Sequence, residues 1–532
     1  MTTEHEKSDD RVVPEGRRKA VPTAFRTGGT QGGKAVTATK QDVQLRLFPA
    51  TAEKPRREKS RADTNARAVG DLSPSARRKG PKAGETRWRA RPAMTMEEVA
   101  DEGNLLRSFK KVADNKGAAG PDRKSIGDVE GHLASLIPGL SKSLIDGTYT
   151  PGEIRRVWIP KPDGSQRGLG IPNVVDRMVQ QAFLEVLDPH YDETFHDSSH
   201  GFRRGRSCHT AIALAKEHME SGASWVVDID LEKFFDRVNH QRLLSRLEQT
   251  IKDPRIIDTI RKMLKANTVM PDGVVVSTDE GTPQGGPLSP LLSNIVLDEL
   301  DRELERRGLR FVRYADDCNI YVGSERAGRR VMASIRSFIE RKLKLRVNEK
   351  KSEVARPVER HFLGFRLDTN DLGGTEVLLS KRTEERARDK LAQMTPRSWG
   401  DSVPKCIEQL NQYLAGWIGF FVIATEAAAK SIQRVESHAR RRLRAIYVKQ
   451  WKRRRSMTRK LIASGGNAKR VYADIYGGSD SPWRLSHTWS VERMLNNAQF
   501  SRLGLFSIVQ HWRSDLARRS VAAPVQLALS LG

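Results

Sequence analysis

Apolar residues follow the spacing of helices and strands only from about residue 88 onward. Residues 1–87 are rich in Gly, Pro, Ser, Lys and Arg and have few large apolar side chains. Such a segment buries too little surface to offset the entropy cost of ordering it, which predicts a disordered basic extension. Leu105, Phe109 and Val112 then recur at helical spacing, up to a Gly and Pro break at 115–122. We therefore expect the folded part to begin with a helix in this region.

Strand-like patterns occupy the centre of the chain. Residues 155–172 read as two strands around a Pro-Asp-Gly-Ser turn, and 225–230 read as a third strand. Residues 311–322 have two β-favouring arms around a short acidic turn, which predicts a hairpin. Helical faces at 176–187 and 291–300 separate these strands. Strands and helices therefore alternate in this part of the chain.

The last third of the chain changes to helical patterning with a strong excess of basic residues. Ile407, Leu410 and Leu414 mark the apolar face of one helix, and a basic helix follows it. Residues 434–460 contain twelve Lys or Arg and the single acid Glu436. A solvated helix normally mixes both signs of charge, so this excess favours a phosphate-binding surface; a generic basic bundle is the alternative.

The whole chain shares this basic bias, with 93 Lys and Arg against 66 Asp and Glu and a formal charge of +27. Cations placed on phosphates release condensed counterions, so nucleic acid is the favoured partner and an anionic membrane surface the weaker alternative. No apolar run approaches the about 18 residues of a membrane-spanning helix. Cys208, Cys318 and Cys406 have neither disulfide nor zinc spacing. We expect a soluble cytoplasmic protein, and association with a bacterial nucleoid is compatible with its charge.

Two pairs of carboxylates are candidates for catalytic chemistry. Asp228 and Asp230 point to the same face of the strand at 225–230, because side chains alternate along a strand. They repel each other unless a cation or solvent meets them. Asp316 and Asp317 lie in the turn of the predicted hairpin, where an Asp-rich turn without a ligand is the plain structural alternative. For Asp228 we favour an ion pair with a neighbouring cation.

Two further features suit a nucleotide. Lys161 and Arg167 flank the turn of the first hairpin, where cations meet triphosphate oxygens without any base preference; a solvated basic hairpin is an equally common outcome. Residues 281–290 form a rigid Gly- and Pro-rich loop ahead of an amphipathic helix, which is a place to hold a planar ligand. The basic loop at 201–207 suits either template phosphates or plain solvent exposure.

Seven motifs in one order over residues 116–365 resemble those of reverse transcriptases encoded by group II introns. Tyr314-Ala-Asp-Asp317 resembles their metal-binding turn, and the Asp-x-x-x-Phe-Phe-Asp spacing from Asp230 resembles their first metal-binding motif. Gly-Thr-Pro-Gln-Gly, from Gly281, resembles the motif that borders the nascent base pair. The segments at 116–122, 161–167, 345–352 and 361–365 match the remaining motifs, and the basic helices resemble the thumb, or maturase domain.

The resemblance implies an α+β right-hand polymerase fold, with fingers and palm built on an antiparallel sheet and followed by an α-helical thumb. The implied domains are a disordered basic N-terminal extension at 1–87, fingers and palm at 88–375, a thumb or maturase domain at 376–455, and a basic C-terminal nucleic-acid-binding region at 456–532. No Cys follows Cys406. We therefore expect the His-Asn-His endonuclease domain of some relatives to be absent.

The resemblance also implies a role for each candidate residue. Asp230, Asp316 and Asp317 would be the catalytic carboxylates that hold two Mg²⁺ ions. The nucleotide would be bound by Lys161, Arg167, Phe235 and Gln284, with the Phe235 ring beneath the sugar excluding a 2′-hydroxyl. RNA or primer would be bound by Lys351, Gly364, Arg440, Arg441, Arg442 and Arg444.

The implied function is an RNA-directed DNA polymerase, a nucleotidyltransferase that also binds group II intron RNA to assist splicing and retrotransposition. Its partners would be the intron RNA, an RNA template with a DNA primer, deoxynucleoside triphosphates and target DNA. A reverse transcriptase outside introns, for example one used in phage defence, is the first alternative. A splicing-only maturase is the second. A metal-dependent nuclease also clusters carboxylates, but it does not need Gly-Thr-Pro-Gln-Gly between them.

Overall fold

The structure is a computed structural model that describes residues 94–160, 164, 166–396 and 398–530. The predicted disorder of residues 1–87 and the predicted phosphate contact of Lys161 lie outside these described residues. Within the described part, no helix is long and apolar enough to cross a membrane.

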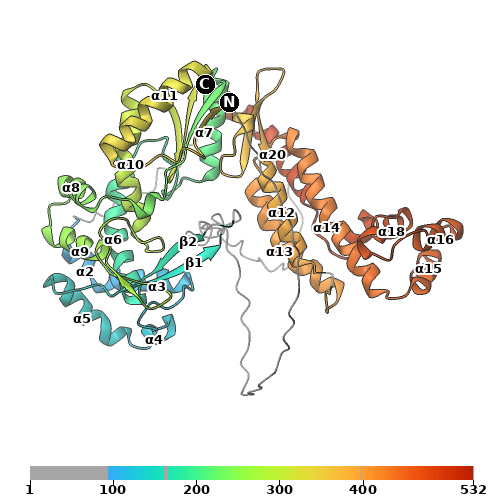
Figure 1. The fold of residues 1–532 in the computed structure, drawn as a ribbon, viewed down its shortest axis with the longest axis horizontal. Helices are drawn as coiled ribbons and strands as arrows, with labels where there is room; N and C mark the ends of the chain where they lie inside the picture. The colour runs from blue at the N-terminus through green and yellow to red at the C-terminus, as the bar shows by residue number, and fades with distance from the viewer. Residues whose placement is uncertain (1–93, 161–163, 165, 397, 531–532) are drawn as a thin grey trace, which may run out of the picture. The chain divides into compact units, whose positions relative to one another are not determined.

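The first described elements are helical, as the apolar spacing predicts. They are α2 (Met96–Ala100), α3 (Glu102–Asp114), α4 (Ile126–Glu130), α5 (Leu133–Ile145) and, after two strands, α6 (Val174–Asp192). The predicted first helix is split at Asp101, whose carboxylate accepts a hydrogen bond from Asn104 N at 2.7 Å and caps α3. α2 and α3 lie against α5 and α6 (Figure 1), so these helices form one packed layer.

A four-stranded sheet contains the first predicted hairpin. Its order is β2 (Gln166–Ile171), β1 (Ile154–Pro160), β4 (Thr268–Val269) and β5 (Val275–Val276), with β1 parallel to β4 and β4 antiparallel to β5. The helices α8 (His240–Thr250) and α9 (Pro254–Leu264) precede β4. β4 and β5 were not predicted, because two residues are too few to show a period.

The central sheet is antiparallel and contains the acidic hairpin. Its order is β6 (Arg310–Tyr314), β7 (Asp317–Val322), β3 (Trp225–Ile229) and β8 (Glu353–Ala355). The helices around it are α7 (Cys208–Glu220), α10 (Ser289–Arg306) and α11 (Glu325–Phe338), the last continued by a π-helical turn at Ile339–Leu343 (Figure 1). The strands and helices expected here are therefore present.

Both faces of the central sheet are buried, each in a different core. Val227 and Ile229 of β3 join the core that contains residues of α10 and of the Ile339–Leu343 turn. Val226, on the opposite face, joins the core that contains α7 and the C-terminal helices, as does Tyr321 of β7. The alternation along β3 thus directs Asp228, like Val226, to the α7 face.

A hairpin and a series of helices complete the chain. They are β9 (Phe365–Thr369), β10 (Thr375–Leu379), α12 (Lys381–Met394), α13 (Val403–Phe421), α14 (Ala429–Gln450), α15 (Arg454–Ala463), α16 (Ala468–Tyr476), α17 (Pro482–Leu485), α18 (Trp489–Met494), α19 (Asn497–Arg502) and α20 (Ile508–Ser530). The predicted basic helix at 434–460 is interrupted near Lys452, whose φ is +59°. The α+β class, with an antiparallel central sheet and C-terminal helices, is confirmed.

Candidate active site

The acidic turn lies at the tip of the β6–β7 hairpin, as predicted. Tyr314 pairs with Asp317, so Ala315 and Asp316 form a two-residue turn. Ala315 has a φ of +57°, in the left-handed region that residues with a Cβ rarely adopt. Two-residue hairpin turns require positive φ at one or both positions, and the turn therefore holds Asp316 at the outermost point of the hairpin.

The end of β3 brings Asp230 to this turn. In the antiparallel pairing of β3 with β7, Ile229 lies opposite Cys318. One residue further along, Asp230 follows Ile229 on one strand, and Asp317 precedes Cys318 on the other. Because opposed residues of antiparallel strands share a face, the register places Asp230 and Asp317 at the same end of the sheet, beside Asp316.

Asp228 differs from Asp230 in its cationic partner. Arg360 Nη2 donates to Asp228 Oδ2 at 2.7 Å, and Arg360 Nε donates to the same oxygen at 2.9 Å. Burial raises the pKa of Asp228, and the Arg360 guanidinium opposes that rise. Lys351 Nζ lies 4.0 Å from Asp230 Oδ2, beyond hydrogen-bond distance. The ion pair predicted for Asp228 is confirmed, and the carboxylate of Asp230 is held more loosely.

The segment at 345–352 lies beside the end of β3. Asn348 N donates to Asp230 O at 2.8 Å, and Asp230 N donates to Ser352 Oγ at 3.0 Å. These main-chain contacts fix the position of Asp230 without using its carboxylate. They also bring the predicted primer-binding residue Lys351 next to the acidic end of the sheet.

The loop at 281–290 contains Gln284 and contacts Arg167 and Phe235, the other two described residues that were predicted to bind the nucleotide. Arg167 Nε donates to Gln284 Oε1 at 2.8 Å. Thr282 N donates to Phe235 O at 2.6 Å. The loop therefore connects strand β2, which carries Arg167, to the turn that follows Asp230 along the chain.

Glycine is required where this loop meets β2. Gly285 has a φ of +136°, and a Cβ at this position would lie 2.3 Å from Gly170 O. Gly170 N in turn donates to Gln284 O at 2.8 Å. The close main-chain approach explains why the sequence has glycine after Gln284.

The predicted hairpin at 361–365 is present as a tight turn. Phe362 and Phe365 exchange two main-chain hydrogen bonds of 2.9 Å around Leu363 and Gly364, whose φ values are +52° and +96°. Gly364 O accepts a hydrogen bond from Thr383 Oγ1 at 2.7 Å. The turn is thereby joined to α12, and a primer contact by Gly364 stays a prediction.

Two of the four arginines predicted to bind RNA connect α14 to neighbouring segments. Arg442 Nε donates to Thr395 Oγ1 at 2.8 Å. Arg444 Nε donates to Leu495 O at 2.9 Å, and the Arg444 side chain is 10% exposed. These contacts stabilise the helical region, and an RNA contact by either residue stays a prediction.

The other two arginines, Arg440 and Arg441, line a cavity of about 530 Å³. Its wall also contains Arg388, Arg434, His438 and the buried Arg444, together with one acid, Glu492. Burial and the neighbouring guanidinium groups lower the pKa of His438 to about 4, so its imidazole is neutral at pH 7. The cavity therefore combines several permanent cations with a neutral imidazole, which suits an anionic group such as phosphate.

The basic loop at 201–207 has internal partners. Each of its three arginines pairs with an acid: Arg203 with Asp192 at 2.7 Å, Arg204 with Asp188 at 2.7 Å and Arg206 with Asp197 at 2.5 Å. These ion pairs favour a plain basic loop over a loop that binds template phosphates.

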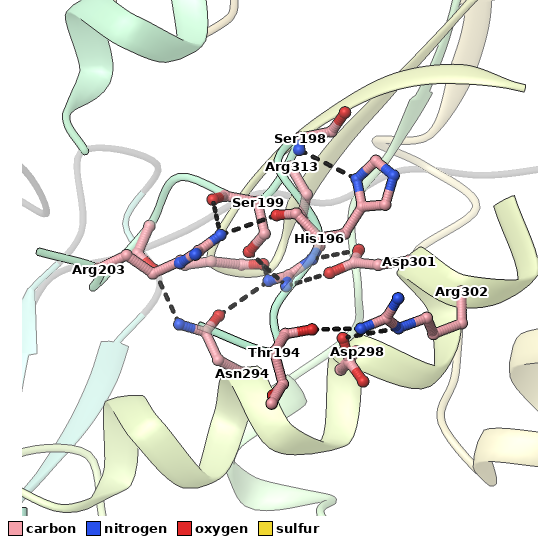
Figure 2. Close-up of polar contacts among 12 residues, drawn as sticks. Thr194, His196, Ser198, Ser199, Arg203, Asn294, Asp298, Asp301, Arg302 and Arg313 are labelled. Carbon is pink, nitrogen blue, oxygen red and sulfur yellow. Dashed lines mark hydrogen bonds and ion pairs between the residues drawn. The ribbon is translucent and has the colours of Figure 1, made fainter. Parts of the chain in front are cut away.

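Sequence reasoning missed the buried residues beneath the acidic turn. Arg313, in β6, is fully buried and donates from Nε and Nη2 to the two carboxylate oxygens of Asp301 at 2.7 and 2.5 Å. Arg313 Nη1 donates to Ala315 O, in the turn itself, at 2.9 Å. Figure 2 shows Arg313 surrounded by side chains of α10 and of the loop that precedes α7. The signal in the sequence was a single charged residue in an otherwise apolar strand arm.

The donor set of the acidic end suits a divalent cation. Mg²⁺ prefers hard oxygen ligands and uses one or two carboxylates, completing its shell with substrate phosphates and water. Among the residues that the structure describes, no three His, Cys, Asp or Glu side chains form a metal site of their own. An ion held jointly by Asp230, Asp316 and Asp317 therefore stays a prediction.

Acidic residues lie at the ends of two adjacent antiparallel strands. The loop beside them joins strand β2, which carries Arg167, to the turn that carries Phe235. Together these are features of a template-dependent nucleic-acid polymerase. Residues 159–367 match the family described as reverse transcriptase (RNA-dependent DNA polymerase), and 385–462 match the group II intron maturase-specific domain. The chain belongs to the reverse transcriptases encoded by group II introns. This family uses divalent metal ions, and its maturases bind intron RNA.

Three relatives illustrate the similarity. Protein YkfC of Escherichia coli is 32% identical over 346 residues, which cover 58% of this chain and 90% of that protein. The group II intron-encoded protein LtrA of Lactococcus lactis is 39% identical over 209 residues, covering 39% of this chain and 34% of LtrA. The putative COX1/OXI3 intron 2 protein of Saccharomyces cerevisiae is 34% identical over 209 residues, covering 39% of this chain and 24% of that protein. The chain therefore spans most of the first relative and a minor part of the other two.

Proposed function

We propose that this chain extends a DNA primer on an RNA template and also binds group II intron RNA to assist splicing and retrotransposition. The observation that carries the proposal is the register of β3 and β7. Ile229 lies opposite Cys318, so Asp230, which follows Ile229, and Asp317, which precedes Cys318, lie at the same end of the two strands. A polymerase needs carboxylates from separate strands at one point, and this register supports that arrangement.

In this proposal Asp230, Asp316 and Asp317 hold two Mg²⁺ ions. When bound, the ions would lower the pKa of the primer 3′-hydroxyl and stabilise negative charge on the pyrophosphate leaving group. Asp228 is not a ligand, because Arg360 occupies its carboxylate. Lys351 Nζ, 4.0 Å from Asp230 Oδ2, partly offsets the charge of that carboxylate.

The incoming deoxynucleoside triphosphate is bound beside the loop at 281–290. The hydrogen bond from Arg167 to Gln284 orients the guanidinium, which with Lys161 meets the phosphate oxygens. Phe235 lies beneath the sugar and excludes a 2′-hydroxyl by its bulk. Its main-chain hydrogen bond from Thr282 supports this position, because it fixes the ring's backbone to the same loop.

We assign fingers and palm of a right-hand polymerase to residues 88–375, a thumb to 376–455 and a nucleic-acid-binding region, which would contact target DNA, to 456–532. The cationic cavity formed by Arg388, Arg434 and Arg441 supports phosphate binding by the thumb. RNA backbone is the favoured ligand, because the match to the maturase-specific domain includes α14. Lys351 and Gly364 would contact the primer strand.

The test is primer extension on an RNA template with Mg²⁺, using the whole chain and its Asp316→Asn variant. We expect DNA synthesis by the parent protein, its loss in the variant, and equal binding of intron RNA by both. Loss of synthesis and RNA binding together would mean that Asp316 is structural. No synthesis by a folded parent protein would contradict the proposal.

A further inference from the structure

A buried polar cluster lies directly beneath the turn that contains Asp316. Arg313 and Asp301 are both completely buried, and so is Ser199. The guanidinium group has five N–H donors, and each has an acceptor: both oxygens of Asp301, Asn294 Oδ1, Ser199 Oγ and Ala315 O. Figure 2 shows the side-chain partners converging on Arg313. A fully satisfied buried network of this kind rigidifies the groups that it joins.

The same cluster holds the turn through a second element. Asn294 Nδ2 donates to Gly201 O at 2.9 Å. A Cβ on Gly201 would lie 2.3 Å from Ala315 N, so the main chain at Gly201 touches the turn directly. In addition, Arg313 N donates to Ser198 O at 2.8 Å. The turn is thus held by α10 and by the loop that contains Gly201.

We propose that Arg313, oriented by Asp301, is a positioning residue that holds the left-handed Ala315–Asp316 turn in the conformation that metal binding requires. The inference rests on the proposed polymerase function, and it adds a role for buried residues that do not touch substrate. Ala315 O accepts a charged donor in a buried environment, where such a bond is stronger than in solvent. Without that donor, the turn is free to leave its left-handed conformation.

The ion pair alone does not account for this arrangement. A buried pair with the same shape can be replaced by apolar side chains with little loss of stability, whereas removal of one partner leaves an unpaired charge. The bond to Ala315 O is different, because no apolar side chain can donate it. Stability and positioning are therefore separable in this cluster.

The test uses the double variant Arg313→Met with Asp301→Leu in the whole chain. We expect the double variant to fold, because no unpaired charge remains, but with a lower unfolding temperature, because Asn294 Oδ1, Ser199 Oγ and Ala315 O lose their donor. We expect kcat for primer extension to fall by about 100-fold, the size of effect that a misplaced catalytic group produces, with KM for the nucleotide unchanged. The Mg²⁺ concentration at half-maximal activity should rise, and the Mg²⁺-induced increase in unfolding temperature should shrink.

The matched control is Tyr149→Phe, which removes the buried hydrogen bond from Tyr149 Oη to Asp176 Oδ1, 2.6 Å long and separate from this cluster. This control should lower the unfolding temperature without changing the Mg²⁺ requirement. A folded double variant with the kcat and Mg²⁺ requirement of the parent protein would overturn the inference, while synthesis by the parent would leave the proposed function standing.

If the double variant does not fold, Asp301→Asn decides the question. The amide keeps one acceptor for Arg313 but removes the charge and the bidentate geometry. A higher Mg²⁺ requirement in folded Asp301→Asn supports positioning. An unchanged Mg²⁺ requirement, with a loss of activity that is explained by the lower unfolding temperature as in Tyr149→Phe, overturns the positioning role of Arg313.

Discussion

Arginines have opposite surroundings in two regions of this molecule, beneath the acidic hairpin and on helix α14. Beneath the hairpin, Arg313 is fully buried and every donor has an acceptor within the chain. On α14, Arg444 and Arg434 both line the cationic cavity, but the Arg444 side chain is 10% exposed and donates to Leu495 O, whereas the Arg434 side chain is 68% exposed. Charge counted along a sequence therefore predicts a nucleic-acid partner, but it does not predict which arginines contact that partner.

The difference between the two regions comes from backbone geometry. In the hairpin, alternation along the strands and the two-residue turn fix where each carboxylate points. On α14, rotation of about 100° per residue sends adjacent arginines to different neighbours. Arg441 lies over the Trp483 ring, with Cζ 3.9 Å from the centroid. Arg442, whose Cζ is 5.6 Å from the same ring, also donates to Thr395, and Arg444 donates to Leu495. In a basic helix such as α14, some arginines therefore stabilise the fold, while others are left to bind a ligand.

The largest expected effect separates Asp230 from Asp228. Asp230→Asn removes a carboxylate whose cationic neighbour among the described residues, Lys351, lies 4.0 Å away, and we expect DNA synthesis to fall by about 1,000-fold or more, as for loss of a charge-stabilising group. Asp228→Asn leaves Arg360 with a weaker partner, so we expect a lower unfolding temperature with synthesis retained. Primer extension and thermal unfolding of both variants measure this. Equal loss of synthesis would contradict the distinction.

The next largest effect distinguishes Arg444 from Arg434 in the helical region. Arg444→Ala leaves Leu495 O without its donor, and we expect a loss of about 2 kcal/mol in the free energy of unfolding, measured by denaturant titration. Arg434→Ala should change stability by less than about 0.5 kcal/mol. It should instead weaken RNA binding and reduce its log–log salt slope by about 1. An unchanged slope in Arg434→Ala would remove the cavity from the RNA interface.

A smaller effect is expected at Phe235. Replacing the ring by the smaller side chain in Phe235→Val opens space at the position proposed for the sugar. We expect the preference for deoxynucleotides over ribonucleotides to fall by about 10–100-fold, since one pocket contact contributes roughly 1–3 kcal/mol of discrimination. Single-nucleotide incorporation with each triphosphate measures the ratio. Unchanged selectivity together with full activity would place the sugar elsewhere.

The effect that is smallest at neutral pH is a pH dependence of stability beneath the hairpin. Burial, followed by the charges of Arg206, Arg203 and Arg313, lowers the pKa of His200 to about 4. The unfolded chain, with a His pKa of about 6.5, binds the proton first as pH falls. His200 therefore reduces stability progressively between pH 6.5 and 4, by at most about 1.4 kcal/mol per pH unit, and not above that window. His200→Gln should flatten the unfolding temperature over this range; parallel curves would refute the prediction.

Local rules were sufficient to predict the acidic hairpin and the ends of its strands. The turn at Ala315 and Asp316 and the shared face of Asp228 and Asp230 depend on residues that are adjacent in the sequence. The sequence predicted that Asp228 forms an ion pair, but it did not identify the partner, because Arg360 lies 132 positions away. A single sequence contains no signal for a pairing over that distance.

The role of Arg313 was out of reach for the same reason. Its acceptors come from α10 and from the loop before α7, and a charged residue in a strand arm is more often solvent-exposed than buried. The break after α14 was also missed, because Lys452 adopts a positive φ that lysine seldom adopts. Contacts between distant segments decide such features, and local pattern does not contain them.

Metal-directed cleavage of the chain tests most directly whether Asp230 and Asp316 share a metal site. Fe²⁺ is substituted for Mg²⁺ in the presence of template, primer and nucleotide, and ascorbate with peroxide then generates hydroxyl radicals at the bound ion. Main-chain cuts next to both Asp230 and Asp316, absent in Asp316→Asn, are the expected result. Cuts near one carboxylate alone, or a pattern that Asp316→Asn leaves unchanged, would contradict a shared site.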